Sequence, residues 1–282
     1  MPRRLPSKGF IKYDKIFRIG QRSSSMQKHG RVALVTGAGS GIGASIAIAL
    51  AREELAVACA DLDLEAAEQT AKTILSAGGA AAAFQVDISD DQAVAGLPAV
   101  VAGTLGAVDV LVNNAGIGGE SPTSSVSIDD VRSVLRINLE GSVAVTLAFL
   151  SHLKESASGR ILNIASIQGF RGARDSLAYG ASKGALVNLT RGLACDLADD
   201  GILVNALAPG FVDTPMARLP DGATEYETDW FQSIYVENAR IPLRRPADPD
   251  EIAQAALFFC SPQNTYVTGQ VLAVDGGMTA TF

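Results

Sequence analysis

A tyrosine and a lysine stand four residues apart in the stretch YGASK, Tyr179 to Lys183, within a region otherwise rich in Ala, Gly and Leu. On a helix this spacing places both side chains on one face. A neighbouring ammonium lowers the pKa of a phenol, ordinarily about 10, because it favours the phenolate. The pair could therefore exchange a proton with a substrate hydroxyl or carbonyl near neutral pH. A core tyrosine beside a solvated lysine would share the same spacing.

A glycine-rich stretch, TGAGSGIG from Thr36 to Gly43, is the second candidate site. It follows an apolar run and leads into a segment with helical composition. Glycines permit a tight turn and close approach of backbone to a phosphate, and the N-terminus of a following helix offers free N–H groups to an anion. This position between strand and helix favours a dinucleotide-binding turn over an ordinary one.

The acidic residue Asp61 lies eighteen residues beyond Gly43, after the next apolar run. A carboxylate there can accept hydrogen bonds from a ribose 2′-hydroxyl but repels a 2′-phosphate. Neither the glycine-rich turn nor the stretch DLDLE supplies an Arg or Lys that could receive that phosphate. The sequence therefore favours NAD over NADP. Asp61 could instead cap the following helix, although Asp63 is better placed to do so.

The elements that must position these residues alternate between short apolar runs and longer helical segments. The runs occupy 31–36, 56–60, 82–86, 108–113, 160–165, 202–208 and 270–274, and helical segments begin near Gly41, Leu64, Asp90, Ser127, Ala178 and Asp248. Strands that are apolar throughout are buried on both faces, which indicates a parallel sheet covered by helices. We expect one doubly wound (Rossmann-type) α/β domain of seven strands over 28–282, with ligands outside the carboxyl ends of the strands.

Composition excludes several classes of protein. Of the 282 residues 48% are apolar and 19% charged, which suits a large core, and no apolar run reaches the length needed to span a bilayer. The net charge of −7 leaves about −14 on the chain beyond the first thirty residues, so neither nucleic acid nor membrane is an expected partner. Three scattered cysteines and two histidines predict a reducing, cytoplasmic setting and no metal site.

The basic beginning of the chain, residues 1–27, lacks the apolar core of a secretory signal. Its richness in Arg, Lys and Ser resembles an organelle transit peptide. Alternatively, the natural start is Met26, just before the first strand, and the preceding residues are a disordered or non-native tail. We favour the second interpretation because composition alone is weak evidence.

The motifs in this order make the chain resemble the short-chain dehydrogenase/reductase family, from about Lys28 to the end. The resemblance rests on several stretches: TGxxxGxG at 36, Asp61, Asp87, NNAG at 113, Asn138, Ser166, YxxxK at 179, APG at 208 and VTGQVLAVDGG at 267. Each stretch alone is ordinary, since Asx residues are common in turns. Their conjunction carries the specificity.

The resemblance implies a reaction and the residues that perform it. Tyr179 would give or take the proton at the substrate oxygen, Lys183 would lower the pKa of Tyr179 and hold the nicotinamide ribose, Ser166 would polarise the substrate oxygen, and Asn138 would fix a water in a proton relay. Besides Tyr179 and Lys183, the residues implied to contact the cofactor are Gly37, Ser40, Gly41, Ile42, Gly43, Asp61, Asp87, Ile88, Asn114, Ala115, Gly116, Pro209, Gly210, Val212 and Thr214.

The segment 213–244 would be the substrate lid of such an enzyme. Its aromatic residues Trp230, Phe231 and Tyr235 could wall a pocket or be buried at a subunit contact. We expect an NAD-dependent dehydrogenase of a secondary alcohol, most simply a sugar, polyol or similar small polar compound. A 3-oxoacyl-thioester reductase and a non-catalytic dinucleotide-binding sensor are the alternatives. The family habit further implies a homotetramer.

Overall fold

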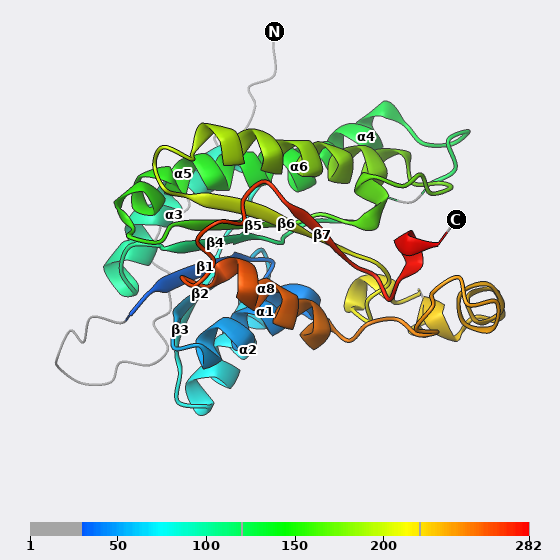
Figure 1. The fold of residues 1–282 in the computed structure, drawn as a ribbon, viewed down its shortest axis with the longest axis horizontal. Helices are drawn as coiled ribbons and strands as arrows, with labels where there is room; N and C mark the ends of the chain where they lie inside the picture. The colour runs from blue at the N-terminus through cyan, green and yellow to red at the C-terminus, as the bar shows by residue number, and fades with distance from the viewer. Residues whose placement is uncertain (1–29, 120, 220, 282) are drawn as a thin grey trace, which may run out of the picture.

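The computed structural model describes residues 30–119, 121–219 and 221–281. The basic tail predicted at 1–27 lies outside the described residues. The described chain is built around a seven-stranded sheet in the order β3-β2-β1-β4-β5-β6-β7, with every neighbouring pair parallel. Helices cover both faces of this sheet (Figure 1). The predicted doubly wound α/β fold is therefore confirmed.

The strands follow the apolar runs closely. They are β1 Val32–Thr36, β2 Ala56–Asp61, β3 Ala80–Gln85, β4 Val110–Asn113, β5 Arg160–Ile164, β6 Leu203–Pro209 and β7 Val271–Val274. Every residue of β1, β4 and β5 is buried, which agrees with a central position between two helical layers. The strand order reverses direction between β1 and β4, and the crevice outside the carboxyl ends of these two strands is where such sheets bind ligands.

The helices separate into two layers, which Figure 1 shows below and above the sheet. The lower layer contains α1 Gly41–Arg52, α2 Leu64–Ser76 and α8 Pro249–Cys260, and the upper layer contains α3 Asp91–Thr104, α4 Ile128–Leu135, α5 Ser142–Glu155 and α6 Leu177–Asp196. Several begin at a capping side chain: Asp63, Asp90, Ser127 and Asp248 each accept a hydrogen bond from a first-turn N–H. These caps explain why the helices start where the sequence predicts.

One helix differs from the expectation. A π-helical turn, Arg136–Gly141, joins α4 to α5 in a continuous helix, Ile128–Glu155, that is long and apolar enough to cross a membrane by length and composition. The expectation that no apolar segment reaches that length is therefore wrong. Charged residues in the first half of the helix hide its length in the sequence. Phe149 and Leu153 are fully buried against the sheet, as in the core helix of a globular domain, whereas Leu147 is 61% exposed.

The segment 213–244 carries a small hydrophobic cluster of its own. It includes the three-residue helix α7 Asp229–Phe231 and a second π-helical turn, Gln232–Glu237. Phe231 is fully buried, with its ring 5.0 Å from that of Phe211 and 4.8 Å from that of Tyr226. Phe231 therefore belongs to the core of this segment rather than to a pocket wall, whereas Trp230 is 57% exposed.

The last described residues pack against the end of this segment. Gly276 and Gly277 have positive φ angles of 63° and 86°, and a β-carbon on them would come within 2.9 Å of Ile241 and 3.0 Å of Pro242. Beyond them, the guanidinium of Arg171 donates to the carbonyl oxygen of Thr279 at 2.9 Å. The carboxyl end of the chain thus connects the 213–244 segment to the loop after β5.

At the amino ends of the strands, a buried arginine holds the beginning of β5. Arg160 is 4% exposed, and its guanidinium donates to the carbonyl oxygens of Gly159, Ser261 and Asn264 at 2.8, 3.3 and 2.6 Å. Ser261 is the C-cap residue of α8, and Asn264 lies in the segment that follows it. Arg160 therefore joins the sheet to the chain just beyond the C-terminus of this helix.

Candidate active site

The glycine-rich turn between β1 and α1 has the shape of an anion cradle. Gly37 and Gly41 adopt positive φ angles of 65° and 52°. A β-carbon on Gly43 would lie 2.0 Å from the carbonyl oxygen of Gly37, so the turn can close only because this residue has no side chain. Ser40 is the N-cap of α1 but makes no side-chain capping bond. The N–H groups of the first turn of α1 remain suited to a phosphate.

Asn114, in the NNAG stretch, holds this turn in place through hydrogen bonds. The side-chain amide of Asn114 donates to the carbonyl oxygens of Thr36 and Gly37 at 3.0 and 3.1 Å. The hydroxyl of Thr36 in turn accepts from the N–H groups of Asn114 and Ala115, each at 3.1 Å. Asn114, predicted to contact the cofactor, thus has both side-chain donors occupied in joining the ends of β1 and β4. Any contact with a dinucleotide would come from its remaining groups.

Asp61 lies at the end of β2 and faces the glycine-rich turn. One carboxylate oxygen accepts from the N–H of Gly39 at 2.8 Å, and the other accepts from the N–H of Asp63 at 3.0 Å. Asp63, by contrast, caps α2 by accepting from Ala66. The alternative in which Asp61 itself caps that helix is therefore wrong. The carboxylate of Asp61 is fixed beside the turn, where it can meet a ribose.

Asp87 and Ile88 follow β3 at the same edge of the sheet. The carboxylate of Asp87 accepts hydrogen bonds from the N–H and the hydroxyl of Ser89 at 2.9 and 2.7 Å. Asp87 is exposed. Ile88 is buried and packs on the π-helical turn, where a β-carbon on Gly141 would come within 2.9 Å of it. The two residues predicted to contact the cofactor therefore lie just beyond the carboxyl end of β3, and Asp87 is exposed to solvent.

The residues after β6 form the far side of the crevice. The N–H of Gly210 donates to the carbonyl oxygen of Val274, and Val212 is buried and pairs with Ala247. Thr214 reaches back to the glycine-rich turn: a β-carbon on Gly41 would lie 3.1 Å from its methyl group. The structure therefore places Thr214, and with it the start of the 213–244 segment, over the N-terminus of α1. Pro209 is the last residue of β6.

Lys183 is buried at the carboxyl end of β5, only 5% exposed. Its ammonium donates to the carbonyl oxygen of Ile164 at 2.8 Å. Removal from water lowers its pKa to about 8, because the charged form loses hydration. The ammonium lies 5.5 Å from the centre of the Tyr179 ring. Tyr179 and Lys183 thus share one face of α6, as their four-residue spacing predicts.

Ser166 stands two residues beyond the end of β5 and is 7% exposed. Its hydroxyl accepts from the N–H of Gln168, which caps a short 3-10 helix, Ile167–Gly169. A β-carbon on Gly169 would lie 2.8 Å from the backbone carbonyl oxygen of Lys183. The turn after Ser166 therefore rests directly on the turn of α6 that carries Lys183. The structure brings these residues to one end of the sheet.

Asn138 lies in the π-helical turn and is fully buried. Its side-chain amide donates to the carbonyl oxygen of Ile117 at 2.9 Å and to the hydroxyl of Ser182 at 3.0 Å, and its amide oxygen accepts from the N–H of Ile117 at 2.8 Å. Gly116 lies beside it, since a β-carbon there would be 3.0 Å from that oxygen and 3.7 Å from the ammonium of Lys183. With both side-chain donors occupied, Asn138 could hold a water through its backbone or its amide oxygen.

Ser182 is a residue that the sequence analysis missed. It is fully buried, and its hydroxyl donates to the carbonyl oxygen of Tyr179 at 2.7 Å while accepting from Asn138. It thereby links the π-helical turn to the turn of α6 that carries Tyr179. Its place between Tyr179 and Lys183 in YGASK was visible in the sequence, but serine is common and its partner lies 44 residues away.

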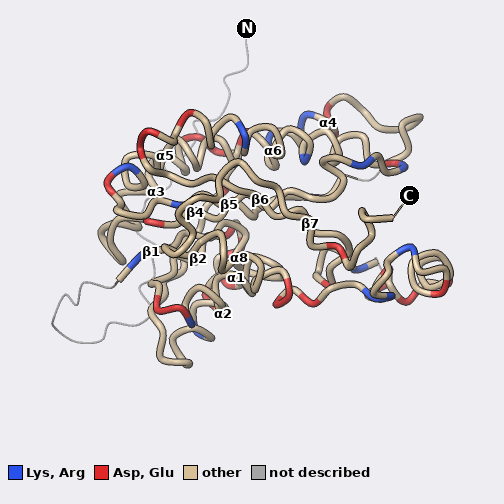
Figure 2. Tube along the Cα trace, viewed as in Figure 1, with Lys and Arg blue, Asp and Glu red and all other residues tan. Residues whose placement is uncertain are grey.

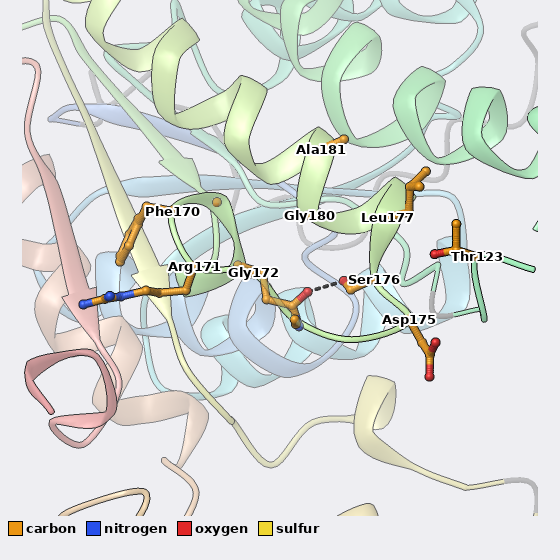
Figure 3. Close-up of a pocket in the computed structure, with 12 residues that line it drawn as sticks. Thr123, Phe170, Arg171, Gly172, Asp175, Ser176, Leu177, Gly180 and Ala181 are labelled. Carbon is orange, nitrogen blue, oxygen red and sulfur yellow. Dashed lines mark hydrogen bonds between the residues drawn. The ribbon is translucent and has the colours of Figure 1, made fainter. Parts of the chain in front are cut away.

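An open cavity of about 420 Å³ borders the site (Figure 3). Its walls come from the turn after Ser166, including Gln168, Phe170 and Arg171, and from the start of α6. The hydroxyl of Ser176 donates to the side-chain oxygen of Gln168. Figure 3 shows the side chain of Arg171 extending away from Ser176. The lining mixes polar and apolar side chains, which suits a small ligand with several polar groups.

Charged residues of both signs lie on the 213–244 segment and on the loop after β5. Figure 2 shows acidic and basic residues mixed along the 213–244 segment. Arg218 pairs with Asp213 at 3.4 Å, and Arg244 donates to the carbonyl oxygens of Val236 and Glu237. Arg171 and Arg174, on the loop after β5, are exposed. In the part of the chain that the structure describes, no group of three or more His, Cys, Asp or Glu could hold a metal ion.

Comparison with known proteins gives a match along most of the chain. Residues 37–279 match a family model, adh_short_C2, described as enoyl-(acyl carrier protein) reductase. The chain is 40% identical over 252 residues to the cis-4-hydroxycyclohexanecarboxylate dehydrogenase of Sinomonas cyclohexanicum, covering 89% of this chain and 97% of that protein. It is 34% identical over 254 residues to a 3-oxoacyl-[acyl-carrier-protein] reductase of Thermotoga maritima, covering 90% and 99%.

A solved structure has the same fold. The gluconate 5-dehydrogenase from Burkholderia cenocepacia J2315, in complex with NADP and tartrate, superposes with a TM-score of 0.83. It is 34% identical in sequence, and the match covers 90% of this chain and 96% of that one. These similar proteins act on hydroxyl or keto groups of quite different molecules.

Proposed function

The chain belongs to the short-chain dehydrogenase/reductase family, and on that premise we propose that it is an NAD-dependent dehydrogenase of a small polar secondary alcohol. Membership of the family makes it an oxidoreductase that acts on hydroxyl and keto groups. The choice of NAD, the class of substrate and the roles of individual residues form the proposal. The observation that carries it is the arrangement of Tyr179 and the buried Lys183 on one face of α6, beside the turn after Ser166.

The residues at the carboxyl ends of β1 and β2 fit a dinucleotide. The glycine-rich turn would hold the diphosphate at the N-terminus of α1, and Asp61 would accept hydrogen bonds from the adenosine ribose. Because the carboxylate of Asp61 is already fixed beside Gly39, a 2′-phosphate would meet its negative charge at close range. NAD is therefore favoured. The gluconate 5-dehydrogenase similar to this chain is in complex with NADP, so the preference for NAD over NADP has to be tested by experiment.

The remaining residues would handle the proton and the substrate oxygen. The Tyr179 hydroxyl would give a proton to the ketone oxygen, or take one from the alcohol, as a general acid or base. Lys183 would hold the phenolate electrostatically and keep its other ammonium hydrogens available to the nicotinamide ribose. Ser166 would donate a hydrogen bond to the substrate oxygen where negative charge develops. The bound nicotinamide would supply the hydride chemistry.

The cavity beside the site supports a small polar substrate. Thr123, Gln168, Ser176, Arg171 and Asp175 contribute polar groups to its wall. A sugar, polyol or hydroxy acid could form hydrogen bonds with such groups, whereas an acyl chain could form none. The 213–244 segment would close over this substrate as a lid.

A 3-oxoacyl-thioester reductase is the second candidate. The Thermotoga maritima relative has that activity by its name, and the exposed Arg171 and Arg174 could meet an anionic carrier. The acidic Asp61 weighs against it, because it disfavours NADP.

We further propose that the enzyme works as a homotetramer in the cytoplasm. Its upper helical layer exposes apolar side chains that a partner would cover, among them Leu147 of α5 at 61% and Leu177 of α6 at 45%. Size-exclusion chromatography with light scattering would measure the mass of the assembly, and a monomer would contradict this part of the proposal.

The first test follows NADH formation by the purified protein across polyols, sugars, hydroxy acids and 3-hydroxyacyl thioesters, with Tyr179→Phe as the matched variant. Turnover of one polar class that falls about 10²- to 10⁴-fold in the variant is the expected result. Oxidation of the 3-hydroxyacyl thioesters alone, with NADP as the hydride acceptor, would select the second candidate. No turnover despite NADH binding would contradict the proposed substrate classes.

A further inference from the structure

We propose that Asn113 and Asn163, a buried pair in the sheet, are positioning residues for the reaction because they set the places of both helices that carry the catalytic groups. This inference rests on the proposed function. It concerns residues to which the family motifs assign no catalytic or cofactor role.

The pair spans two neighbouring strands. Asn113 of β4 and Asn163 of β5 are direct register partners, and they are 3% and 0% exposed. The side-chain amide of Asn113 donates to the amide oxygen of Asn163 at 2.9 Å. Both side chains therefore leave the same face of the sheet, toward α5 and α6. Two buried amides among apolar strands are unusual enough to require a reason.

Asn163 is bonded to α6. Its amide donates to the hydroxyl of Thr190 at 2.9 Å, and that hydroxyl donates to the carbonyl oxygen of Leu186 at 2.8 Å. Thr190 lies seven residues, about two turns, beyond Lys183 and so on the same face of the helix. Lys183 is bonded to Ile164, the neighbour of Asn163 on β5. The strand therefore holds the helix at two points two turns apart.

Asn113 is bonded in the same way to α5. Its amide donates to the hydroxyl of Thr146 at 3.0 Å, and that hydroxyl donates to the carbonyl oxygen of Ser142 at 2.8 Å. The hydroxyl of Ser142 then donates to the carbonyl oxygen of Asn138 at 3.0 Å. These residues recur every four positions along one helical face. A series of side-chain hydrogen bonds, at residues spaced four apart, thus links Asn113 to the π-helical turn.

A contribution to stability does not by itself explain this pair of buried amides. The amide oxygen of Asn113 is buried and has no hydrogen-bond partner in the described part of the structure. An unpaired buried acceptor lowers stability, and two apolar side chains of similar shape would avoid that cost. Unlike apolar side chains, the amides form directional hydrogen bonds, and these fix the position of each helix along the strand it contacts.

The direction matters because Ser166 lies three residues beyond Asn163 on the same segment. If α6 shifts along β5, Tyr179 and Lys183 move relative to Ser166. A misplacement of about 1 Å can lower a rate by about 10²-fold. The chemistry therefore depends on bonds made two turns away from it.

The test uses Thr190→Val, which keeps the shape of the side chain but removes the hydroxyl, with Thr190→Ser as the conservative variant that restores it. Asn163→Leu is the more severe change. Asn205→Leu is the matched control, because Asn205 is an equally buried amide on β6 that bonds to Val267 and Gln270 and not to α5 or α6.

Two measurements are made on each variant. One is steady-state turnover of a compound accepted in the substrate panel. The other requires no substrate: the ionisation of Tyr179 is followed by tyrosinate absorbance against pH, after subtraction of the same titration with Tyr179→Phe. This second measurement keeps the inference testable even if the proposed function fails for want of a substrate.

We expect Thr190→Val and Asn163→Leu to lower kcat by about 10- to 100-fold, to leave the KM for NAD nearly unchanged and to shift the Tyr179 titration. Thr190→Ser should behave as the unchanged enzyme, and Asn205→Leu should lose stability only. Equal kcat per folded molecule in all variants, with an unshifted titration, would overturn the inference. So would a loss in Asn205→Leu as large as in Asn163→Leu.

Discussion

The ammonium of Lys183 donates to the carbonyl oxygen of Ile164, 2.8 Å away, from a position where burial lowers its pKa to about 8. One side chain thus fastens α6 to β5 and also carries a proton that the folded protein loses more readily than the unfolded chain. The group proposed to assist catalysis therefore costs the fold stability at neutral pH.

The cofactor-free protein should become more stable as pH rises from about 8 to about 10.5, relative to Lys183→Met. In that range the unfolded chain still binds the Lys183 proton, whereas the folded protein has released it. Because unfolding therefore takes up a proton, raising the pH makes unfolding less favourable. The gain would be roughly 3 kcal/mol over the whole range. Urea unfolding of both proteins at several pH values measures it. Parallel curves for the two proteins would contradict the prediction.

Asp61→Asn should move cofactor preference toward NADP. The amide keeps the size of the carboxylate but removes the charge that would face a 2′-phosphate. We expect the ratio of kcat/KM for NADP to that for NAD to rise by at least about tenfold, or about 1.4 kcal/mol. Asp63→Asn is the matched control, because it caps α2 in the same loop, and its ratio should not change. An unchanged ratio in Asp61→Asn would remove the argument for NAD.

Gly43→Ala should abolish tight cofactor binding. Its β-carbon would lie 2.0 Å from the carbonyl oxygen of Gly37, so the turn would have to open. Fluorescence titration with NADH should show affinity reduced by about tenfold or more. Gly96→Ala, inside α3 with no atom within 4 Å of the new carbon, should leave binding unchanged and add about 0.5–1 kcal/mol of stability. Equal NADH affinity in both variants would refute the close packing of the turn.

Arg160→Ala should destabilise the fold by roughly 2–4 kcal/mol, since it leaves the buried carbonyl of Asn264 and the partly buried carbonyl of Ser261 without their donor. Thermal and urea unfolding measure the loss. Arg132→Ala is the control: its ion pair with Asp129 is 70% and 84% exposed, so its removal should change stability by less than about 0.5 kcal/mol. Similar losses in the two variants would show that burial of Arg160 does not matter.

The sheet was predictable because its strands are apolar throughout. Runs such as that ending at Thr36 can be buried on both faces only between two helical layers, and the structure places them there. The residues at the carboxyl ends of the strands were predictable for the same reason, since topology brings all these ends to one edge. Asp61 beside Gly39 is an example.

What the sequence did not reveal depends on contacts between distant segments. The π-helical turn at Asn138, the role of Ser182 and the partners of Asn163 arise from side chains that meet across 27 to 50 residues. The burial of Phe231 likewise depends on Phe211 and Tyr226 folding around it. Local periodicity reports which face of an element is apolar but not which polar atom it will meet.

The packing of Gly276 and Gly277 against Ile241 and Pro242, with Thr279 bonded to Arg171, has a practical consequence for anyone handling the protein. A purification tag or fusion partner joined after Phe282 would begin four positions beyond Thr279. It would pull on the same contacts that hold the 213–244 segment in place. Fusions at the carboxyl terminus should therefore be compared with untagged protein before any substrate preference is read from them.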